Sequence, residues 1–89
     1  MQQLLTPDAT IMYDYDRIQD MLYILFEPVK EATFYEDVPD QPGIMLRFNI
    51  SDERVVGITA HDVLERLSSD ISQDIAVRHL AQELVNQLR

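Results

Sequence analysis

Cysteine is absent from this 89-residue chain. Disulfides, thiol catalysis and cysteine-ligated zinc or iron–sulfur sites are therefore excluded. Glycine and proline are scarce, at two and four residues, and 46 % of the chain is hydrophobic. This is the composition of a globular domain rather than of a disordered chain. We expect a single domain over residues 1–89, small enough that a partner covering apolar surface would add substantially to its stability.

Long hydrophobic runs and basic residues are also scarce. The longest wholly apolar run has six residues, Met21 to Phe26, whereas a membrane-spanning helix needs about 20. The N-terminal stretch lacks the basic region and apolar core of a signal peptide, so a cytoplasmic location is expected. Seven basic and sixteen acidic residues give a net charge of −9. Nucleic acids and anionic membranes are bound through basic groups, so we expect neither as a partner.

The stretch from Tyr13 to Phe26 organises the predicted sheet. Residues 11–15 alternate between apolar and polar side chains, which indicates a strand with one apolar face. Residues 16–20 break the pattern with an aspartate at each end, as is typical of a turn. Residues 21–26 are apolar at every position, which indicates a central strand covered on both faces. Together these segments predict a hairpin.

Three further strands are expected downstream, at residues 32–36, 44–50 and 55–58. A loop over residues 37–43 contains two prolines and a glycine and separates the first two of them. Residues 1–10 show neither the helical nor the strand period and contain Pro7, so they are expected to be a loosely ordered N-terminus. The sheet is thus predicted to occupy residues 11–58 as a five-stranded antiparallel meander.

The hydrophobic period becomes helical after residue 58. Ala60, Val63, Leu64 and Leu67 recur at helical spacing, which predicts a short helix starting at Thr59. A second helix is expected from residue 72 to the C-terminus, with an apolar stripe that includes residues 77, 80, 81, 84 and 88. The predicted fold class is therefore α+β, with two C-terminal helices, over residues 59–89, packed on the sheet.

Two segments carry a resemblance to a known family. Tyr15-Asp16, Asp20 and Leu22-Tyr23-Ile24 resemble the YD…D-x-LYI signature of the small bacterial family called domain of unknown function 2283. Residues 44–48 and 51–58 are similar to that family's second hairpin. The turn of that hairpin usually carries a glycine where this chain has Glu53 or Arg54. The resemblance covers about residues 13–58 and implies a compact, sheet-rich domain; family members sit in small operons suggestive of toxin–antitoxin pairs.

Asp14, Asp16 and Asp20 are the candidate metal ligands, because carboxylates at a strand end and turn offer oxygen atoms to a hard cation. Their spacing is not that of a calcium-binding EF-hand loop: counted from Asp14, the sixth residue is Gln19 rather than glycine, and the twelfth is Leu25 rather than glutamate. The alternative interpretation is that these aspartates hydrogen-bond the turn. A true site would make the chain a small metal-dependent protein or enzyme; otherwise no cofactor is expected.

No other pattern indicates catalysis. A histidine-based nucleophilic site needs a positioned nucleophile and an orienting carboxylate, and neither His61 nor His79 belongs to such a pattern. We expect both histidines at the surface or at a helix junction. The tyrosines are expected to pack within the sheet, because base-stacking platforms are accompanied by a positive groove. The sequence therefore favours a protein that is not an enzyme.

The predicted sheet has more apolar residues than a monomer with helices on only one face needs. Residues 21–26 are apolar on both faces, and Met12 and Met45 fall on the outward side of their strands. We expect a second subunit to cover this surface; the alternative is a monomer with one helix on each face. The residues expected at the interface are Met12, Met21, Tyr23, Met45, Leu84 and Leu88.

The function expected from these observations is that of an acidic interaction module. It is predicted to form a homodimer, and the resemblance allows it to be the antitoxin-like partner of a small basic protein. An acidic surface steers basic partners by long-range attraction.

Overall fold

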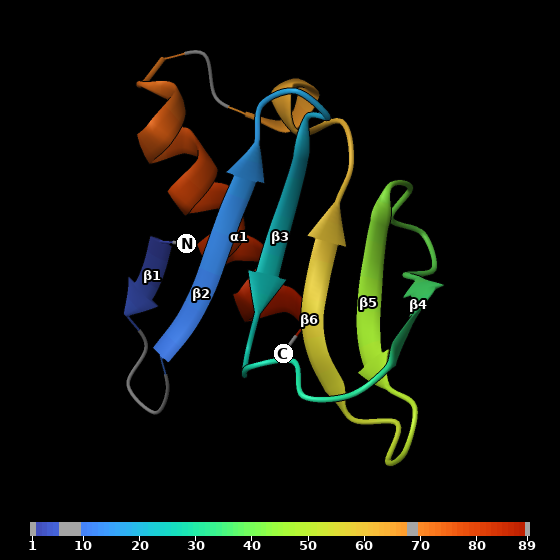
Figure 1. Cartoon of the computed structure of the whole chain (residues 1–89). Coiled ribbons are helices and arrows are strands. Elements are labelled where there is room, and N and C mark those ends of the chain that lie inside the picture. The colour runs from blue at the N-terminus through green and yellow to red at the C-terminus, as the bar shows by residue number, and fades with distance from the viewer. Residues whose placement is uncertain (1, 6–9, 68–69, 89) are drawn as a thin grey trace.

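The computed structural model describes residues 2–5, 10–67 and 70–88 (Figure 1). Within them, six strands form one antiparallel sheet and a single α-helix packs on one of its faces. The strands are β1 (Gln2–Leu5), β2 (Thr10–Asp16), β3 (Met21–Leu25), β4 (Thr33–Asp37), β5 (Ile44–Asn49) and β6 (Val55–Ala60). A 3₁₀ turn, η1 (Val63–Arg66), precedes the helix α1 (Gln73–Leu88). The α+β class and the antiparallel sheet are confirmed.

The strand order is β1-β2-β3-β6-β5-β4, so the sheet is not one continuous meander. Each of the two halves is a run of hairpins, β1-β2-β3 and β4-β5-β6, and the last strand of each half pairs with the other at the centre. Residues 26–32 connect the halves by passing the ends of β6 and β5 to reach β4 at the far edge (Figure 1).

The core lies between the sheet and α1. Tyr13, Ile24 and Ile58 are register partners across β2, β3 and β6, and all three are buried on the side that α1 covers. The helix contributes four buried residues to the same cluster: Val77, Ala81, Leu84 and Val85. Their spacing places them on one side of the helix, as predicted. Among the described helices, none is long and apolar enough to cross a membrane.

The prediction of five strands is wrong, because β1 adds a sixth at the N-terminus. Gln2 to Leu5 pair with Tyr13 to Thr10 in antiparallel register. Leu4 lies opposite Ile11 and is 2 % exposed. A four-residue strand is too short to show a hydrophobic period. The extended conformation of β1 is therefore determined by its pairing with β2 rather than by its own sequence.

The prediction of two helices is also wrong, because the chain remains a strand through Ala60. Ala60 pairs with Leu22 on one side and Ile44 on the other and is fully buried. These ladder contacts override the helical spacing of residues 60–67, of which only the four-residue turn η1 is helical. Leu64, expected on the apolar stripe, is 55 % exposed. The second predicted helix is confirmed, since α1 spans Gln73–Leu88.

The turn between β5 and β6 contains a strained residue. Glu53 has φ of 57°, in the left-handed region, where a side chain costs about 1–2 kcal/mol and glycine does not. This is the turn in which the family that the chain resembles usually carries a glycine. We therefore predict that Glu53→Gly raises the free energy of unfolding by about 0.5–1 kcal/mol in chemical denaturation. Glu53→Gln, which removes the charge and keeps the strain, is the control; equal stabilisation by it would contradict this explanation.

Candidate functional site

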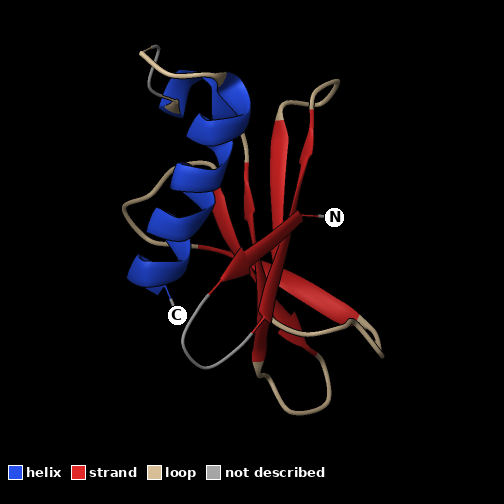
Figure 2. Ribbon diagram, turned by 90° about the vertical axis from the view of Figure 1, so that its left-hand side faces the viewer, coloured by secondary structure: helices blue, strands red, loops and turns tan. Residues whose placement is uncertain are grey.

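The face of the sheet opposite α1 is not covered by any described helix (Figure 2). We call this surface the open face. In Figure 1 it is turned toward the viewer, with α1 behind the sheet. Register pairing assigns to it alternate residues of five strands: Met12, Asp14 and Asp16 of β2, Met21, Tyr23 and Leu25 of β3, Gly57 and Thr59 of β6, Met45 and Arg47 of β5, and Tyr35 and Asp37 of β4.

The structure brings four of the predicted interface residues together on the open face. Met12 lies opposite Leu25, Tyr23 lies opposite Thr59, and Thr59 in turn lies opposite Met45. Met21 is the next open-face residue of β3 after Tyr23. The methionine and tyrosine side chains are all half-buried, which leaves apolar atoms at the surface. The centre of the open face is thus apolar.

The other two predicted interface residues, Leu84 and Leu88, lie on α1. Leu84 is 4 % exposed within the core, and Leu88 packs against the same core. Both contact the chain's own sheet. Their part in an interface stays a prediction, and they do not adjoin the open face.

β6 approaches β3 closely at Gly57, on the open face. Gly57 has no side chain, and a Cβ placed there would come within 2.5 Å of the Ile24 carbonyl oxygen. Thr59, the next residue on this face, is small and 3 % exposed. On the neighbouring strand Leu25 and Tyr23 stand beside these two positions. Sequence reasoning missed this close approach of β3 and β6, although a glycine within a strand is a known sign of it.

Charged side chains flank the apolar centre. On β5, the Arg47 Nε donates a hydrogen bond to Thr33 Oγ1 at 2.9 Å, and its guanidinium lies over the Tyr35 ring, 5.5 Å from the centroid. These contacts hold Arg47 along the face. Asp14 is exposed on the other side, on β2. The open face therefore carries Arg47 and the exposed Asp37 at one flank, and Asp14 and Asp16 at the other.

Two of the three candidate metal ligands are engaged by the chain itself. Asp16 Oδ1 accepts hydrogen bonds from the backbone N–H groups of Ile18 and Gln19, at 2.9 and 3.1 Å. Asp20 Oδ1 accepts from the Tyr15 hydroxyl at 2.6 Å. Over the residues that the structure describes, no group of three or more acidic or histidine side chains is arranged to hold a metal ion. The metal site stays a prediction, to be tested by cation titration in a calorimeter.

Asp20 also ties the β2–β3 turn to η1. Its carboxylate accepts from the backbone N–H of Leu64, and its carbonyl accepts from that of Val63 at 3.3 Å. Burial, and then the hydrogen bond to Asp20, raises the pKa of Tyr15 to about 12 from 10.0. The neutral phenol is thus the form that the folded state favours.

This shift predicts a pH dependence of stability. Since the pKa of Tyr15 is higher in the folded chain than in the unfolded one, its contribution is complete below about pH 10. It is lost as the pH rises from 10.0 to about 12. We expect the free energy of unfolding to fall across that range, and to fall less in Tyr15→Phe, when measured by urea denaturation at several pH values. An equal fall in both proteins would contradict the role of Tyr15.

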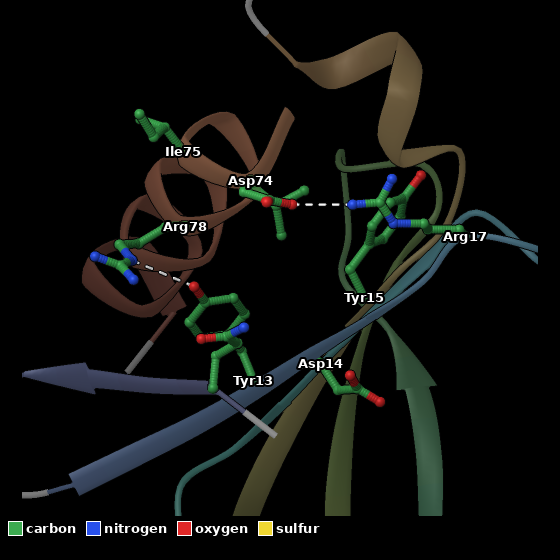
Figure 3. Close-up of a pocket in the computed structure, with 9 residues that line it drawn as sticks. Tyr13, Asp14, Tyr15, Arg17, Asp74, Ile75 and Arg78 are labelled. Carbon is green, nitrogen blue, oxygen red and sulfur yellow. Dashed lines mark hydrogen bonds and ion pairs between the residues drawn. The ribbon is translucent and has the colours of Figure 1, made fainter. Parts of the chain in front are cut away.

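A groove of about 360 Å³ lies between the C-terminal half of β2 and the first half of α1 (Figure 3). Tyr13 forms part of its floor, and its hydroxyl accepts a hydrogen bond from Arg78 Nε at 3.3 Å. Arg17 Nη2 pairs with Asp74 Oδ1 at 3.0 Å, and Figure 3 shows this ion pair joining the turn to the helix. These polar contacts link α1 to the sheet. The groove contains no histidine among its lining residues.

The two histidines lie apart from the groove. The His61 backbone N–H donates to the Gly43 carbonyl at 2.8 Å, just after β6 ends. His79 is exposed on α1. Neither side chain forms a hydrogen bond with a serine or carboxylate in the described part of the chain, so the geometry there does not assemble a nucleophilic site.

A family model described as "Protein of unknown function (DUF2283)" matches residues 12–63. The match spans more than half of the chain, from β2 to the beginning of η1, and confirms the resemblance seen at residues 13–58. Neither the curated proteins nor the solved structures compared with this chain gave a match. The matched region contains β3 to β6 and most of β2, and it excludes β1 and α1.

Proposed function

Because the chain belongs to the DUF2283 family of proteins of unknown function, its surfaces are the best guide to its role, and we propose that it is a non-catalytic interaction module. In this proposal the chain forms a homodimer through the open face. The observation that carries it is the apolar centre of that face, formed by methionine, tyrosine and leucine side chains and not covered by any described helix.

The physical reason is the cost of leaving this surface in water. Monomeric soluble proteins rarely expose a contiguous apolar patch larger than a few hundred Å² unless it binds something. A sheet face that stays in water normally carries polar side chains, and this chain, with 16 acidic residues, is rich in them. Closed two-fold dimers are the most common oligomers of soluble proteins. A second copy therefore accounts for the apolar composition of the open face.

A charge at the centre of the open face tests this proposal. We predict that Met45→Glu raises the dissociation constant of the dimer by about 100-fold or more, because an unpaired charge would be buried in the interface. The measurement is the molar mass from size-exclusion chromatography with light scattering, across a dilution series. Ile18→Glu is the matched control, because Ile18 is 97 % exposed in the β2–β3 turn. A dimer that tolerates Met45→Glu would contradict an interface on this face.

A second candidate role is the binding of a basic protein along β4. This strand pairs with β5 on one side, and among the described residues no strand pairs with its other side. Three acidic side chains, Glu31, Glu36 and Asp37, are exposed along or beside it. Such an edge can accept an extended segment as an additional strand, and its charge favours a basic one. Co-purification with a small basic protein encoded nearby, lost in Glu36→Lys, would support this role.

A further inference from the structure

The outer edge of β4 combines unpaired backbone groups with aromatic rings and carboxylates. We propose that this edge binds an extended segment of another protein as an additional strand, antiparallel to β4. In that segment two adjacent basic residues are followed, one residue later, by an apolar residue. The proposal rests on the binding of a basic protein along β4 and specifies the segment that fits there.

Backbone hydrogen bonds determine which residues of β4 face β5. Just outside the strand, the Ile50 N–H donates to the Ala32 carbonyl at 3.2 Å, and the Val38 N–H donates to the Ile44 carbonyl at 2.9 Å. In an antiparallel pair, residues that bond the neighbouring strand alternate with residues that do not. The even-numbered residues of β4 are therefore the ones that bond β5.

The odd-numbered residues of β4 face the free edge. Thr33, Tyr35 and Asp37 direct their N–H and C=O groups away from β5. Among the described residues no strand pairs with this side of β4, which is the edge of the sheet farthest from β1 (Figure 1). Such outward groups are the ones through which an added strand binds.

An aromatic pair lies beside this edge. Phe34 stacks on Phe48 of β5, with ring centroids 5.1 Å apart, and both rings are half-buried. Glu36, on the same face as Phe34, lies opposite Leu46, which lies opposite the core residue Ile58. This is the face on which α1 packs, but α1 lies behind β2 and β3, at the other end of the sheet from β4 (Figure 1). An apolar side chain opposite Phe34 would cover the exposed part of the rings.

Two consecutive carboxylates determine the charge of the segment. Glu36 lies on the α1 side of β4 and Asp37 on the open face; both are exposed, and neither forms an ion pair among the described residues. Arg47 of β5 is held by Thr33 and Tyr35, toward the other end of β4. Consecutive residues of an added strand point to opposite faces, so two consecutive basic residues would meet the two carboxylates.

The surrounding charges do not reverse this balance. Before β4, the exposed Lys30 and Glu31 offset each other, and after it the exposed Asp40 adds a negative charge. A second copy is a less suitable occupant, because β4 contains two acidic and no basic residues. Pairing β4 with itself would leave its carboxylates without a counter-charge in the added strand. A basic segment supplies that counter-charge.

The order of these contacts gives the order of the residues in the segment. Antiparallel strand pairs outnumber parallel ones about two- to threefold. Running antiparallel to β4, the segment meets Asp37 first, then Glu36, Tyr35 and Phe34. Its sequence is therefore basic, basic, any residue, apolar.

A designed peptide tests this pattern. The fluorescein-labelled peptide SKKVFTS is expected to bind with a dissociation constant on the order of 100 μM in fluorescence anisotropy. The peptide SVKFTKS has the same composition and charge in a different order. We expect it to bind about tenfold more weakly, because its basic residues are not adjacent.

Two variants locate the peptide on the edge. Tyr35→Pro removes an outward N–H and keeps the bonds from β4 to β5, since proline is tolerated in an edge strand where its nitrogen faces solvent. Tyr35→Ala is the matched control, because it removes the same side chain and keeps the N–H. We expect Tyr35→Pro and Glu36→Lys each to weaken binding about tenfold or more, and Tyr35→Ala to stay within about threefold of the unmodified protein.

Hydrogen exchange measured by NMR gives an independent test of the register. Bound SKKVFTS should slow the exchange of the backbone amides of Thr33, Tyr35 and Asp37, which face the free edge. The amides of Phe34 and Glu36, which already bond β5, should change little. Slowing at every second residue is expected of a paired strand and not of a peptide held by charge alone.

Binding that is lost in Tyr35→Pro and Glu36→Lys, with slowed exchange at the outward amides, supports the proposal. Equal binding of the two peptides, full binding by Tyr35→Pro, or no binding up to about 1 mM peptide overturns it. If a basic protein co-purifies with the chain and is released by Glu36→Lys but not by Tyr35→Pro, the role of β4 in binding it stands and the added strand is wrong. A dimer that is lost in Tyr35→Pro but kept in Met45→Glu would show that a second copy occupies the edge, and would also overturn the proposal.

Discussion

Truncation after Leu67 is expected to abolish cooperative folding. The removed segment contains α1, whose Val77, Ala81, Leu84 and Val85 are buried against the sheet. Without it, Ile11, Leu22 and Ile24 would be exposed to water. Each buried aliphatic side chain contributes about 1.5–3 kcal/mol, and a domain has a total stability of only about 5–15 kcal/mol. Far-UV circular dichroism during urea denaturation should show no sigmoidal transition.

A milder variant separates loss of packing from loss of the helix. Leu84→Ala keeps α1 and removes part of one core side chain, so we expect it to fold with a stability lower by about 2–4 kcal/mol. A truncated chain that unfolds cooperatively would show that the helix is dispensable for the sheet. If that chain were folded but had lost its dimer, α1 would be an element exchanged between two copies rather than the cover of its own sheet.

Gly57→Ala is expected to destabilise the fold by about 2–3 kcal/mol, more than an extra methyl group costs at most positions. The added Cβ would lie 2.5 Å from the Ile24 carbonyl oxygen and 3.3 Å from Leu25 Cδ2. The first of these atoms is backbone in the neighbouring strand, so β3 and β6 must move apart to relieve the overlap. Thermal and chemical denaturation of the variant measure this cost.

The chain's other glycine is a matched comparison. A Cβ at Gly43 would lie 2.8 Å from Arg66 Nη2, which is the tip of a flexible side chain, although Gly43 has φ of 82°. Gly43→Ala should therefore cost about 1–2 kcal/mol, the usual penalty of a left-handed backbone. If Gly57→Ala were the milder of the two, the close approach of β3 and β6 would not be the constraint inferred here.

Local patterns predicted most of the secondary structure, and failed where distant strands decide the conformation. Alternation was sufficient for β2 and β5, and continuous apolarity for β3. The end of β6 was misread as helix because Ala60 owes its extended conformation to Leu22 and Ile44, which are far away in the sequence. The strand order could not be predicted either, since hairpin patterns contain no information on which hairpin pairs with which.

The open face was predictable in part. The outward positions of Met12 and Met45 could be read from strand alternation, and those of Met21 and Tyr23 from the continuous apolar run. The structure places all four on one face. That Gly57 and Thr59 of β6 lie next to Tyr23 and Leu25 depends on the pairing of β3 with β6. The same limit applies to the link between Arg78 and Tyr13, which are 65 residues apart. Spacing along the chain cannot indicate such contacts.

The aspartates illustrate how one pattern allows two interpretations. Asp14, Asp16 and Asp20 resemble a cation site in sequence, but the structure assigns each a different environment. Asp16 closes the turn, Asp20 joins Tyr15 to η1, and Asp14 stands exposed on the open face. Side-chain direction, which alternates along a strand, separates residues that are close in sequence.

Sedimentation equilibrium of the unmodified protein tests the central claim most directly, because the claim is that the open face is covered by a second copy. Over about 1–100 μM, an affinity in the range of ordinary homodimers predicts a mass that rises with concentration toward twice the monomer mass of 10.4 kDa. A mass that stays at 10.4 kDa throughout that range would contradict the claim.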